Sequence, residues 1–250
     1  MNHLNTNFLT RVMNTPAQLV EPGIYTSFET IQPSAYDAKA YAYEWLVKQG
    51  LYNRLMWGTR PSDYSGFAYR AVQGNPSEIL DIGCGGLSQT HCVYRELSTP
   101  AVLLDSSLNM LRLGKKRIED SLAQLPQNLA FLQAEAFLLP FADDSFERVV
   151  SFGMIHLFDQ KQDFIREALR VLKPDGTFYF SVLTTDRHLS KKYLLFLQRK
   201  NEVGLPVSSE EMVSMIQPLC ESLDVSVKGS MVFISGEKRK LESLVSDKNN

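Results

Sequence analysis

Short apolar runs alternate with amphipathic segments through the middle of the chain. The runs predict strands buried on both faces of a sheet, and apolar residues at helical spacing predict the helices between them. The strands expected from these runs cover residues 79–82, 101–104, 129–132, 148–153 and 177–183, and the helices cover about 88–97, the stretch from Ser107 to Pro126, and about 160–172. Because strands alternate with helices, we expect a mostly parallel sheet built by right-handed crossovers.

The carboxy-terminal part follows a different pattern. A helix is expected from Ser208 or Ser209 to about Leu223, followed by two β-branched runs at 224–227 and 231–235. The short glycine-containing turn between these runs predicts a hairpin, whose strands are antiparallel. We therefore predict an α/β fold with a doubly wound, mostly parallel, seven-stranded sheet that carries a reversed C-terminal strand.

The sequence before residue 75 predicts a helical lid. Aromatic residues concentrate between Ala35 and Gly74, and Tyr64, Phe67, Ala68 and Ala71 fall on one helix face. Such a segment can cover a ligand crevice, although plain core aromatics explain the same pattern. The predicted organisation is an N-terminal helical lid segment at 1–74, a ligand-binding domain at 75–238 and a frayed tail at 239–250, with the first dozen residues expected to be mobile.

Composition narrows the class of protein. Of 250 residues, 44% are hydrophobic and 22% are charged, which is ordinary for a globular domain. The net charge of −2 gives no reason to expect a nucleic-acid partner, and three scattered cysteines predict neither a disulfide framework nor a metal site. No apolar run has the length of a membrane span, and the N-terminus does not resemble a signal peptide. We expect a cytoplasmic protein, with monomer and homodimer both open.

A glycine turn follows the strand at 79–82. Gly83 and Gly85 allow the backbone to approach a ligand closely, and a helix with Ser88 as its cap is expected to start just after them. Free amides at a helix start bind the polar part of a nucleotide-like ligand. Asp81, just before the turn, can accept from a positively charged or hydroxyl-bearing group.

Four stretches together carry a family resemblance. They are 79–85, the acidic strand end Leu103-Leu104-Asp105, the run 133–146, and 169–177. In their order and separations they resemble the Rossmann-like S-adenosylmethionine-dependent methyltransferases of the ubiquinone/menaquinone-biosynthesis type. The resemblance implies S-adenosylmethionine as the cofactor, S-adenosylhomocysteine as its product, and transfer of a methyl group to a small-molecule acceptor by in-line displacement.

The resemblance also implies the cofactor contacts. They are Asp81, Gly83, Cys84, Gly85, Asp105, Ser106, Met110, Glu135, Ala136, Ser151 and Phe152. Asp105 would accept from the ribose hydroxyls, and Glu135 with Ala136 would meet the adenine edge. The chain departs from the family at Leu87, where a third turn glycine is usual, and at Glu147, where aspartate is frequent.

The acceptor side is less sharply defined by the sequence. His156, on the loop after the fourth strand, is a candidate general base, with a packing role as the alternative. Weaker candidates for substrate contact are Tyr52, Arg60, Tyr64 and Tyr69. The basic stretch from Arg187 to Lys192, with Arg199 and Lys200, is interrupted by apolar residues and predicts the solvent-facing side of a helix. A small, partly apolar acceptor is therefore expected.

Two other functions fit parts of the sequence. A nicotinamide-dependent oxidoreductase shares the strand, turn and helix, but its glycine motif requires a third glycine where Ser88 stands. A methyltransferase-like module could bind the cofactor without turnover and serve a regulatory or assembly role. Release of S-adenosylhomocysteine would distinguish an enzyme from such a module.

Overall fold

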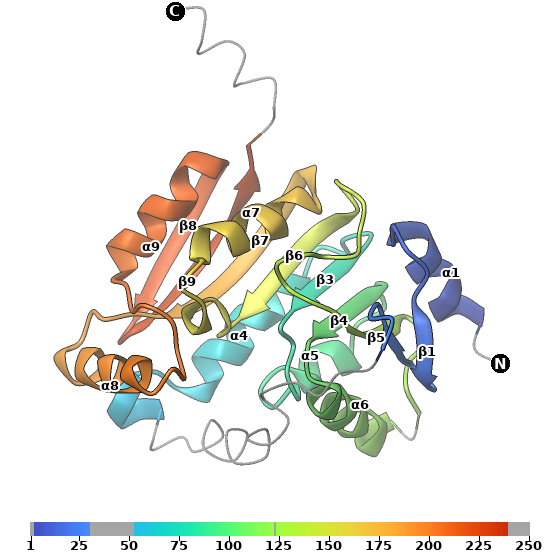
Figure 1. The fold of residues 1–250 in the computed structure, drawn as a ribbon, viewed down its shortest axis with the longest axis horizontal. Helices are drawn as coiled ribbons and strands as arrows, with labels where there is room; N and C mark the ends of the chain where they lie inside the picture. Colours follow the sequence, from blue (N-terminus) through green and yellow to red (C-terminus); the bar gives the residue numbers. More distant parts are fainter. Residues whose placement is uncertain (1–2, 31–52, 123, 240–250) are drawn as a thin grey trace, which may run out of the picture.

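A computed structural model describes residues 3–30, 53–122 and 124–239 of the chain (Figure 1). In these residues one nine-stranded sheet has the order β1-β2-β5-β4-β3-β6-β7-β9-β8. The strands are β1 Gln18–Glu21, β2 Ile24–Thr26, β3 Ile79–Ile82, β4 Ala101–Asp105, β5 Leu129–Gln133, β6 Phe146–Phe152, β7 Leu172–Leu183, β8 Cys220–Lys228 and β9 Met231–Lys238. The helices are α1 His3–Val12, α4 Pro61–Val72, α5 His91–Arg95, α6 Leu108–Leu122, α7 Lys161–Arg170, α8 His188–Arg199 and α9 Ser209–Ile216, with single turns η1 Asn53–Trp57, η2 Ile155–Leu157 and η3 Gln217–Leu219.

The central strands are parallel, as predicted. Strands β2, β5, β4, β3, β6 and β7 pair in parallel, whereas β9 runs antiparallel to both β7 and β8. The α/β class and the reversed C-terminal hairpin are thus confirmed. The chain leaves β3 toward β4 and β5 on one side and later places β6 on the other side. The crevice between β3 and β6 is consequently the switch point of the sheet.

The predicted number of seven strands is wrong by two. The expected strands correspond to β3–β9, and the N-terminal segment adds β1 and β2 at the β5 edge. These two strands form a hairpin around Pro22 and Gly23, and the φ of Gly23 is 81°. Residues 3–12, expected to be mobile, form helix α1. Helix α4 is present as predicted, while residues 31–52 of the proposed lid, with Tyr52, lie outside the described residues.

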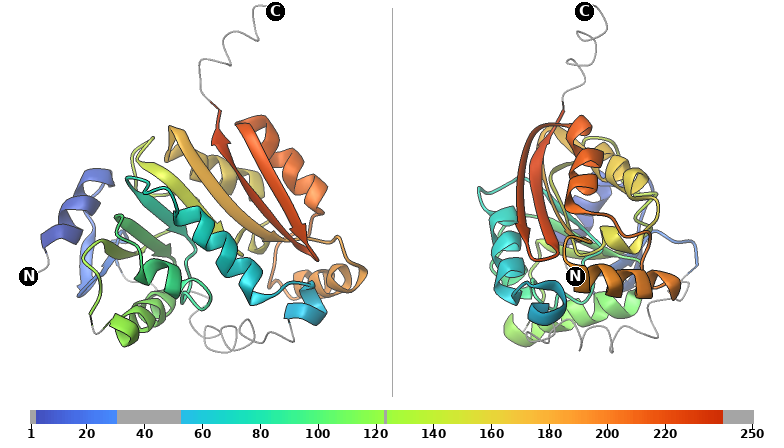
Figure 2. Two further views of the ribbon diagram at one scale, coloured as in Figure 1. Left: turned by 180° about the vertical axis from the view of Figure 1, so that it is seen from behind. Right: turned by 90° about the vertical axis from the view of Figure 1, so that its left-hand side faces the viewer.

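Helices cover both faces of the sheet (Figure 2). On one face α1, α7 and α9 pack on alternate strand residues such as Leu80 and Val102. On the other face α5 and α6 pack on Ile79 and Leu103, and Phe67 of α4 packs on Phe233 of β9. Successive strand residues point to opposite faces. Because both faces are covered, nearly every residue of the central strands β3, β4 and β5 is buried. Among the described residues, no helix is both long and apolar enough to cross a bilayer.

Three boundaries differ from the prediction. The helix expected to run to about Leu223 ends at Ile216, and β8 already begins at Cys220. The turn predicted at 173–176 lies within β7, where the pairing jumps from Phe146 opposite Leu172 to Arg148 opposite Thr177. The four residues therefore protrude from the ladder as an irregularity in one strand. The helix predicted at 88–97 is reduced to α5, because residues 88–90 form turns.

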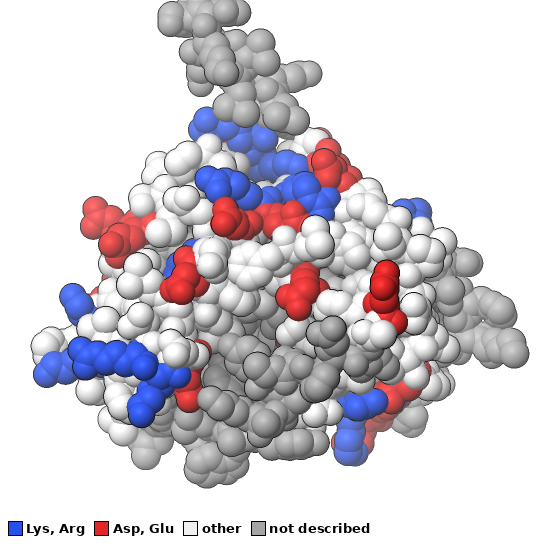
Figure 3. All heavy atoms as spheres, viewed as in Figure 1, with Lys and Arg blue, Asp and Glu red and all other residues white. Residues whose placement is uncertain are grey.

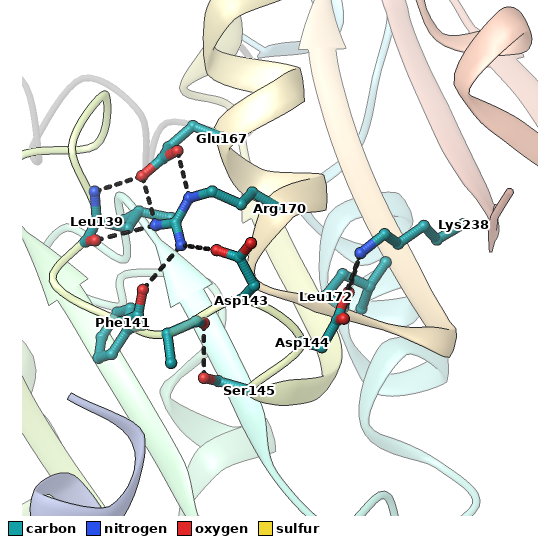
Figure 4. A network of polar contacts seen from close by, with 10 residues as sticks. Leu139, Phe141, Asp143, Asp144, Ser145, Glu167, Arg170, Leu172 and Lys238 are labelled. Carbon is teal, nitrogen blue, oxygen red and sulfur yellow. Dashed lines mark hydrogen bonds and ion pairs between the residues drawn. The ribbon is translucent and has the colours of Figure 1, made fainter. Parts of the chain in front are cut away.

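The predicted turn at 139–146 is fastened by one arginine (Figure 4). The Arg170 guanidinium donates to the carbonyls of Leu139 and Phe141 at 3.1 and 2.9 Å, and to the carboxylates of Glu167 and Asp143 at 2.8 and 2.6 Å. Glu167 in turn accepts from the Leu139 amide at 2.7 Å. These charge-assisted bonds fix the chain that leads from the end of β5 to β6.

Candidate functional site

A pocket lies at the carboxyl ends of β3, β4, β5 and β6. Ten of the eleven residues predicted for the cofactor line it, namely Asp81, Gly83, Cys84, Gly85, Asp105, Ser106, Met110, Glu135, Ala136 and Phe152. Ser151 does not line the pocket. It is fully buried, and it alternates with Phe152 along β6, so the two side chains point to opposite faces. Four loops that are distant in sequence meet here because parallel strands end at one edge.

The glycine turn is held against β4. The amides of Gly83 and Cys84 both donate to the carbonyl of Leu104, at 2.8 and 2.9 Å. Gly83 has a φ of 75°, and a Cβ there would overlap the side chain of Met154. Gly85 has a φ of 55° and faces open space. Both φ values favour glycine, Gly83 also lacks space for a side chain, and Gly85 leaves room for a ligand.

Leu87 occupies the place of the usual third glycine without blocking the turn. Its φ is 56°, and its side chain is directed into the core, where it is 1% exposed. Room for it comes from Gly114 in α6, since a Cβ at Gly114 would lie 3.1 Å from Leu87 and 3.2 Å from Phe131. In the sequence, the sign that a glycine makes room for Leu87 is Gly114, a glycine inside an otherwise good helix.

Asp105 connects the glycine turn to the next helix. One carboxylate oxygen accepts from the Gly85 amide at 2.9 Å and the other from the Ser107 amide at 2.8 Å. The Ser107 hydroxyl accepts from the Met110 amide at 3.2 Å and so caps α6. Asp105 itself lines the pocket. The carboxylate that orders the turn can therefore also face a ligand.

Gln133, at the end of β5, is a positioning residue that the sequence did not single out. Its side chain is buried, accepts from the Thr26 hydroxyl at 3.2 Å, and donates to the Ser106 carbonyl at 3.0 Å. It thereby links the N-terminal strand β2 to the loop that follows Asp105. The signal was a polar residue ending an apolar strand.

Asp81 forms a buried pair with Tyr94 of α5. The Tyr94 hydroxyl donates to one Asp81 oxygen at 2.6 Å, while the other oxygen is buried and has no hydrogen-bond partner among the described residues. Burial raises the pKa of Asp81 to about 7; the Tyr94 hydrogen bond opposes the rise and nearby Asp105 adds to it. Burial likewise raises the pKa of the Cys84 thiol well above its usual value. Asp81 is therefore poised near its titration point beside the pocket.

The wall beside the glycine turn and β6 is aromatic and apolar. Tyr64 of α4 packs edge-on against Phe152, with ring centroids 6.3 Å apart. The Tyr64 hydroxyl lies where a Cβ on Gly153 would point, and the φ of Gly153 is 69°. Leu157 and Phe158 continue this wall.

Three other predicted acceptor-side residues in the described part of the chain, Arg60, Tyr69 and His156, are not part of the pocket lining. Tyr69 is 51% exposed, and Arg60 is an exposed residue whose amide donates to Asp63 at the start of α4. His156 is buried in η2 and is not part of the pocket lining. Burial, with a contribution from Lys161, lowers the pKa of His156 to about 3. A buried neutral imidazole outside the pocket does not support the role of a general base.

The fold and the pocket define the chain as a doubly wound α/β protein with a nucleotide-cofactor type of site at its switch point. Residues 80–180 match the sequence family described as a methyltransferase domain. The resemblance predicted from the sequence is thus confirmed, and this part of the chain carries a methyltransferase domain.

Relatives of known name agree with this assignment. The demethylmenaquinone methyltransferase of Renibacterium salmoninarum is 36% identical over 110 residues, covering 44% of this chain and 41% of that protein. The ubiquinone/menaquinone biosynthesis C-methyltransferase UbiE of Ectopseudomonas mendocina is 30% identical over 167 residues, covering 64% of each. The match therefore spans less than two thirds of either relative.

The fold also has solved counterparts. The phosphoethanolamine N-methyltransferase 2 of Haemonchus contortus, solved with S-adenosyl-L-methionine, has a TM-score of 0.62 and 15% identity, and the likeness covers 82% of this chain and 57% of that chain. At this identity the likeness concerns the fold alone.

Proposed function

We propose that the protein is an S-adenosylmethionine-dependent methyltransferase acting on a small, partly apolar acceptor. The observation that carries the proposal is Asp105, which holds the Gly85 and Ser107 amides and still faces the pocket, inside the segment that matches a methyltransferase domain. Because these two amides already hold the carboxylate in place, it can accept from two vicinal hydroxyls without the entropic cost of ordering its side chain on binding.

The pocket suits the three chemical parts of the cofactor. Gly85 leaves open space beside the turn, and the second oxygen of Asp81 is an acceptor that lacks a protein partner among the described residues. We assign Asp81 to the amino group, Asp105 to the ribose hydroxyls, and the exposed carboxylate of Glu135 with the Ala136 amide to the adenine edge. Met110 and Phe152 provide apolar walls.

The bound cofactor supplies an activated methyl group on a sulfonium. The residues of the chain therefore have to align the acceptor and exclude water. Tyr64, Phe152, Leu157 and Phe158 form the wall suited to this task, and they favour an acceptor with an aromatic or otherwise apolar body. The names of the relatives supply the first class to test, the demethylated quinones.

The test combines binding and turnover on the full chain. Calorimetry with S-adenosylmethionine and S-adenosylhomocysteine measures cofactor binding, with NAD as the control nucleotide. Release of S-adenosylhomocysteine across a panel of apolar ring acceptors, with mass analysis of the product, measures transfer. We expect binding of both sulfur nucleosides, no binding of NAD, and methylation of at least one ring acceptor.

The outcomes separate the possible functions. Indifference to both sulfur nucleosides would overturn the proposal. Binding without methylation of any acceptor would instead support a cofactor-binding module. As a matched control, Asp120→Ala changes an exposed aspartate of α6 that pairs with Lys116 and does not line the pocket, and it should leave binding unchanged, whereas Asp105→Ala should weaken it.

A further inference from the structure

The outward face of α8 combines apolar and basic side chains. We call the set Leu189, Lys192, Leu195, Phe196, Arg199 and Lys200 the α8 face. Its apolar members are well exposed, at 49% for Leu189, 37% for Leu195 and 52% for Phe196. The helix is held to the protein by its opposite side, through buried Ser190 and Leu194 and through the contact of Tyr193 with Trp57. An exposed apolar strip of this kind marks an interaction surface.

The charge of this face is one-sided. No Asp or Glu occurs between Arg187 and Asn201, although the whole chain has a net charge of −2. Figure 3 shows Lys and Arg gathered over the position of α8. Lys192, Arg199 and Lys200 form no ion pair with the described residues, whereas Lys191, beside this face, lies near Glu211 of α9. Exposed apolar groups and cations that have no ion-pair partner in the described part of the chain therefore share one surface.

The arrangement of the two kinds of side chain favours a lipid surface. Leu189 and Phe196 are seven residues apart and lie on the same side of the helix. Lys192 and Lys200 flank this strip, and Lys200 lies 5.9 Å from the Phe196 ring centroid. Lysines beside an apolar strip can keep their ammonium groups at lipid headgroups while the apolar residues enter the acyl boundary. A nucleic acid would use the cations but would leave the leucines without a role.

We propose that the α8 face is a docking surface for an anionic lipid bilayer. Its position relates it to the pocket, because α8 begins just after the carboxyl end of β7, the edge of the sheet at which the pocket opens. The segment after α8 also contacts the loop behind the pocket wall. The Gly204 amide donates to the His156 carbonyl at 3.1 Å, and the Leu205 amide donates to Asp159 at 2.6 Å.

Docking would thus bring the pocket to the bilayer. An apolar acceptor that partitions into lipid could then reach the pocket without crossing water. This consequence rests on the proposed function, but the docking surface itself does not.

The test is flotation of the full chain with lipid vesicles. Vesicles of phosphatidylcholine alone are compared with vesicles of phosphatidylcholine and phosphatidylglycerol. We expect binding to the anionic vesicles, little binding to the zwitterionic ones, and weakening by salt. The pair Lys192→Gln/Lys200→Gln should lower the partition coefficient about tenfold or more, because each cation near an anionic leaflet contributes independently. The pair Leu189→Ser/Phe196→Ser should lower it by a similar factor through lost apolar burial.

Matched controls change similar side chains elsewhere. Leu19→Ser alters a leucine that is 64% exposed on β1, and Lys116→Gln alters an exposed lysine of α6. Both should bind vesicles like the wild type, and all variants should retain the wild-type circular dichroism spectrum and cofactor affinity. Cofactor binding without vesicle binding would overturn the docking surface alone, and the reverse result would overturn only the proposed function. Equal losses in the control variants, or retained vesicle binding in both α8 pairs, would also overturn the docking surface. Binding of heparin that survives Leu189→Ser/Phe196→Ser, with no vesicle binding, would assign the face to polyanions instead.

Discussion

Affinity for S-adenosylmethionine should depend on the protonation of Asp81. Burial raises the pKa of this carboxyl to about 7. Only the ionised carboxylate attracts a ligand ammonium strongly, so a cationic ligand binds the ionised form and releases the proton. Below the pKa the affinity should therefore fall about tenfold per pH unit, which is ~1.4 kcal/mol per unit.

Replacing Tyr94 with Phe should move this dependence to higher pH. The Tyr94 hydroxyl donates to Asp81 at 2.6 Å and opposes the rise in its pKa. A hydrogen bond to a charged group contributes about 1.5–3 kcal/mol, so its loss should raise the Asp81 pKa by roughly one to two units. The other charged or titratable groups near Asp81 are Asp105 and Cys84, and Tyr94→Phe leaves both in place.

Calorimetry of S-adenosylmethionine binding from about pH 5.5 to about 8.5 measures the effect, because this window brackets the pKa of Asp81. The free ligand ammonium titrates in the same way in both experiments. The ratio of wild-type to Tyr94→Phe affinity therefore reports only the part of the pH dependence that comes from the protein. We expect a ratio of roughly ten to a hundred at the acid end of the range, about half of that near pH 7, and a value that shrinks toward one as pH rises further. Asp81→Asn should lack the pH-dependent component. A ratio that stays constant across the range would refute the reasoning, since it would mean that Tyr94 acts only through packing.

Four further substitutions, one of them with a matched control, probe other parts of the structure. Asp105→Ala should weaken cofactor binding by about 1.5–3 kcal/mol, because charge-assisted acceptors are lost; unchanged affinity in calorimetry would remove Asp105 from the site. Gly83→Ala should destabilise the fold by about 1–3 kcal/mol in urea unfolding, because its φ is 75° and Met154 fills the space, whereas Gly66→Ala, in open space on α4, should stabilise it by about 0.5–1 kcal/mol. Between about pH 6.5 and 3, His156 is neutral in the folded protein and gains a proton on unfolding, so the free energy of unfolding falls by up to ~1.4 kcal/mol for each unit that the pH drops. His156→Gln should remove this pH dependence, measured by chemical unfolding at several pH values. The same substitution should leave cofactor affinity unchanged. Arg170→Met should cost about 2–4 kcal/mol of unfolding free energy, since it removes the donor to the carbonyls of Leu139 and Phe141 and leaves Glu167 with the Leu139 amide alone. A variant as stable as the wild type would show that the turn at 139–146 does not depend on Arg170.

Local patterns alone determined most of the architecture. Strands β3–β7 are apolar runs between turn residues, because a strand that is buried on both faces requires apolar side chains at nearly every position. The hairpin of β8 and β9 follows from two β-branched runs around Gly229. The glycine turn and the acidic strand ends were identified through the family resemblance, and they meet in the structure because parallel strands bring their carboxyl ends to one edge. Because these strand ends lie together, ten of the eleven residues predicted to contact the cofactor line one pocket.

Tertiary structure decided the features that depend on a partner distant in sequence. Strand β1 has no buried residue and β2 has three residues, so neither shows a strand pattern without β5 beside β2. His156 was expected at the pocket because its loop follows β6, but the packing of η2 buries its side chain away from the pocket lining. Tyr94 and Gly114 lie on helices, and their relation to Asp81 and Leu87 exists only once α5 and α6 pack on the sheet. A sequence specifies which side chains are apolar or charged along each element, whereas burial, and hence the pKa of Asp81, arises only when separate elements exclude water together.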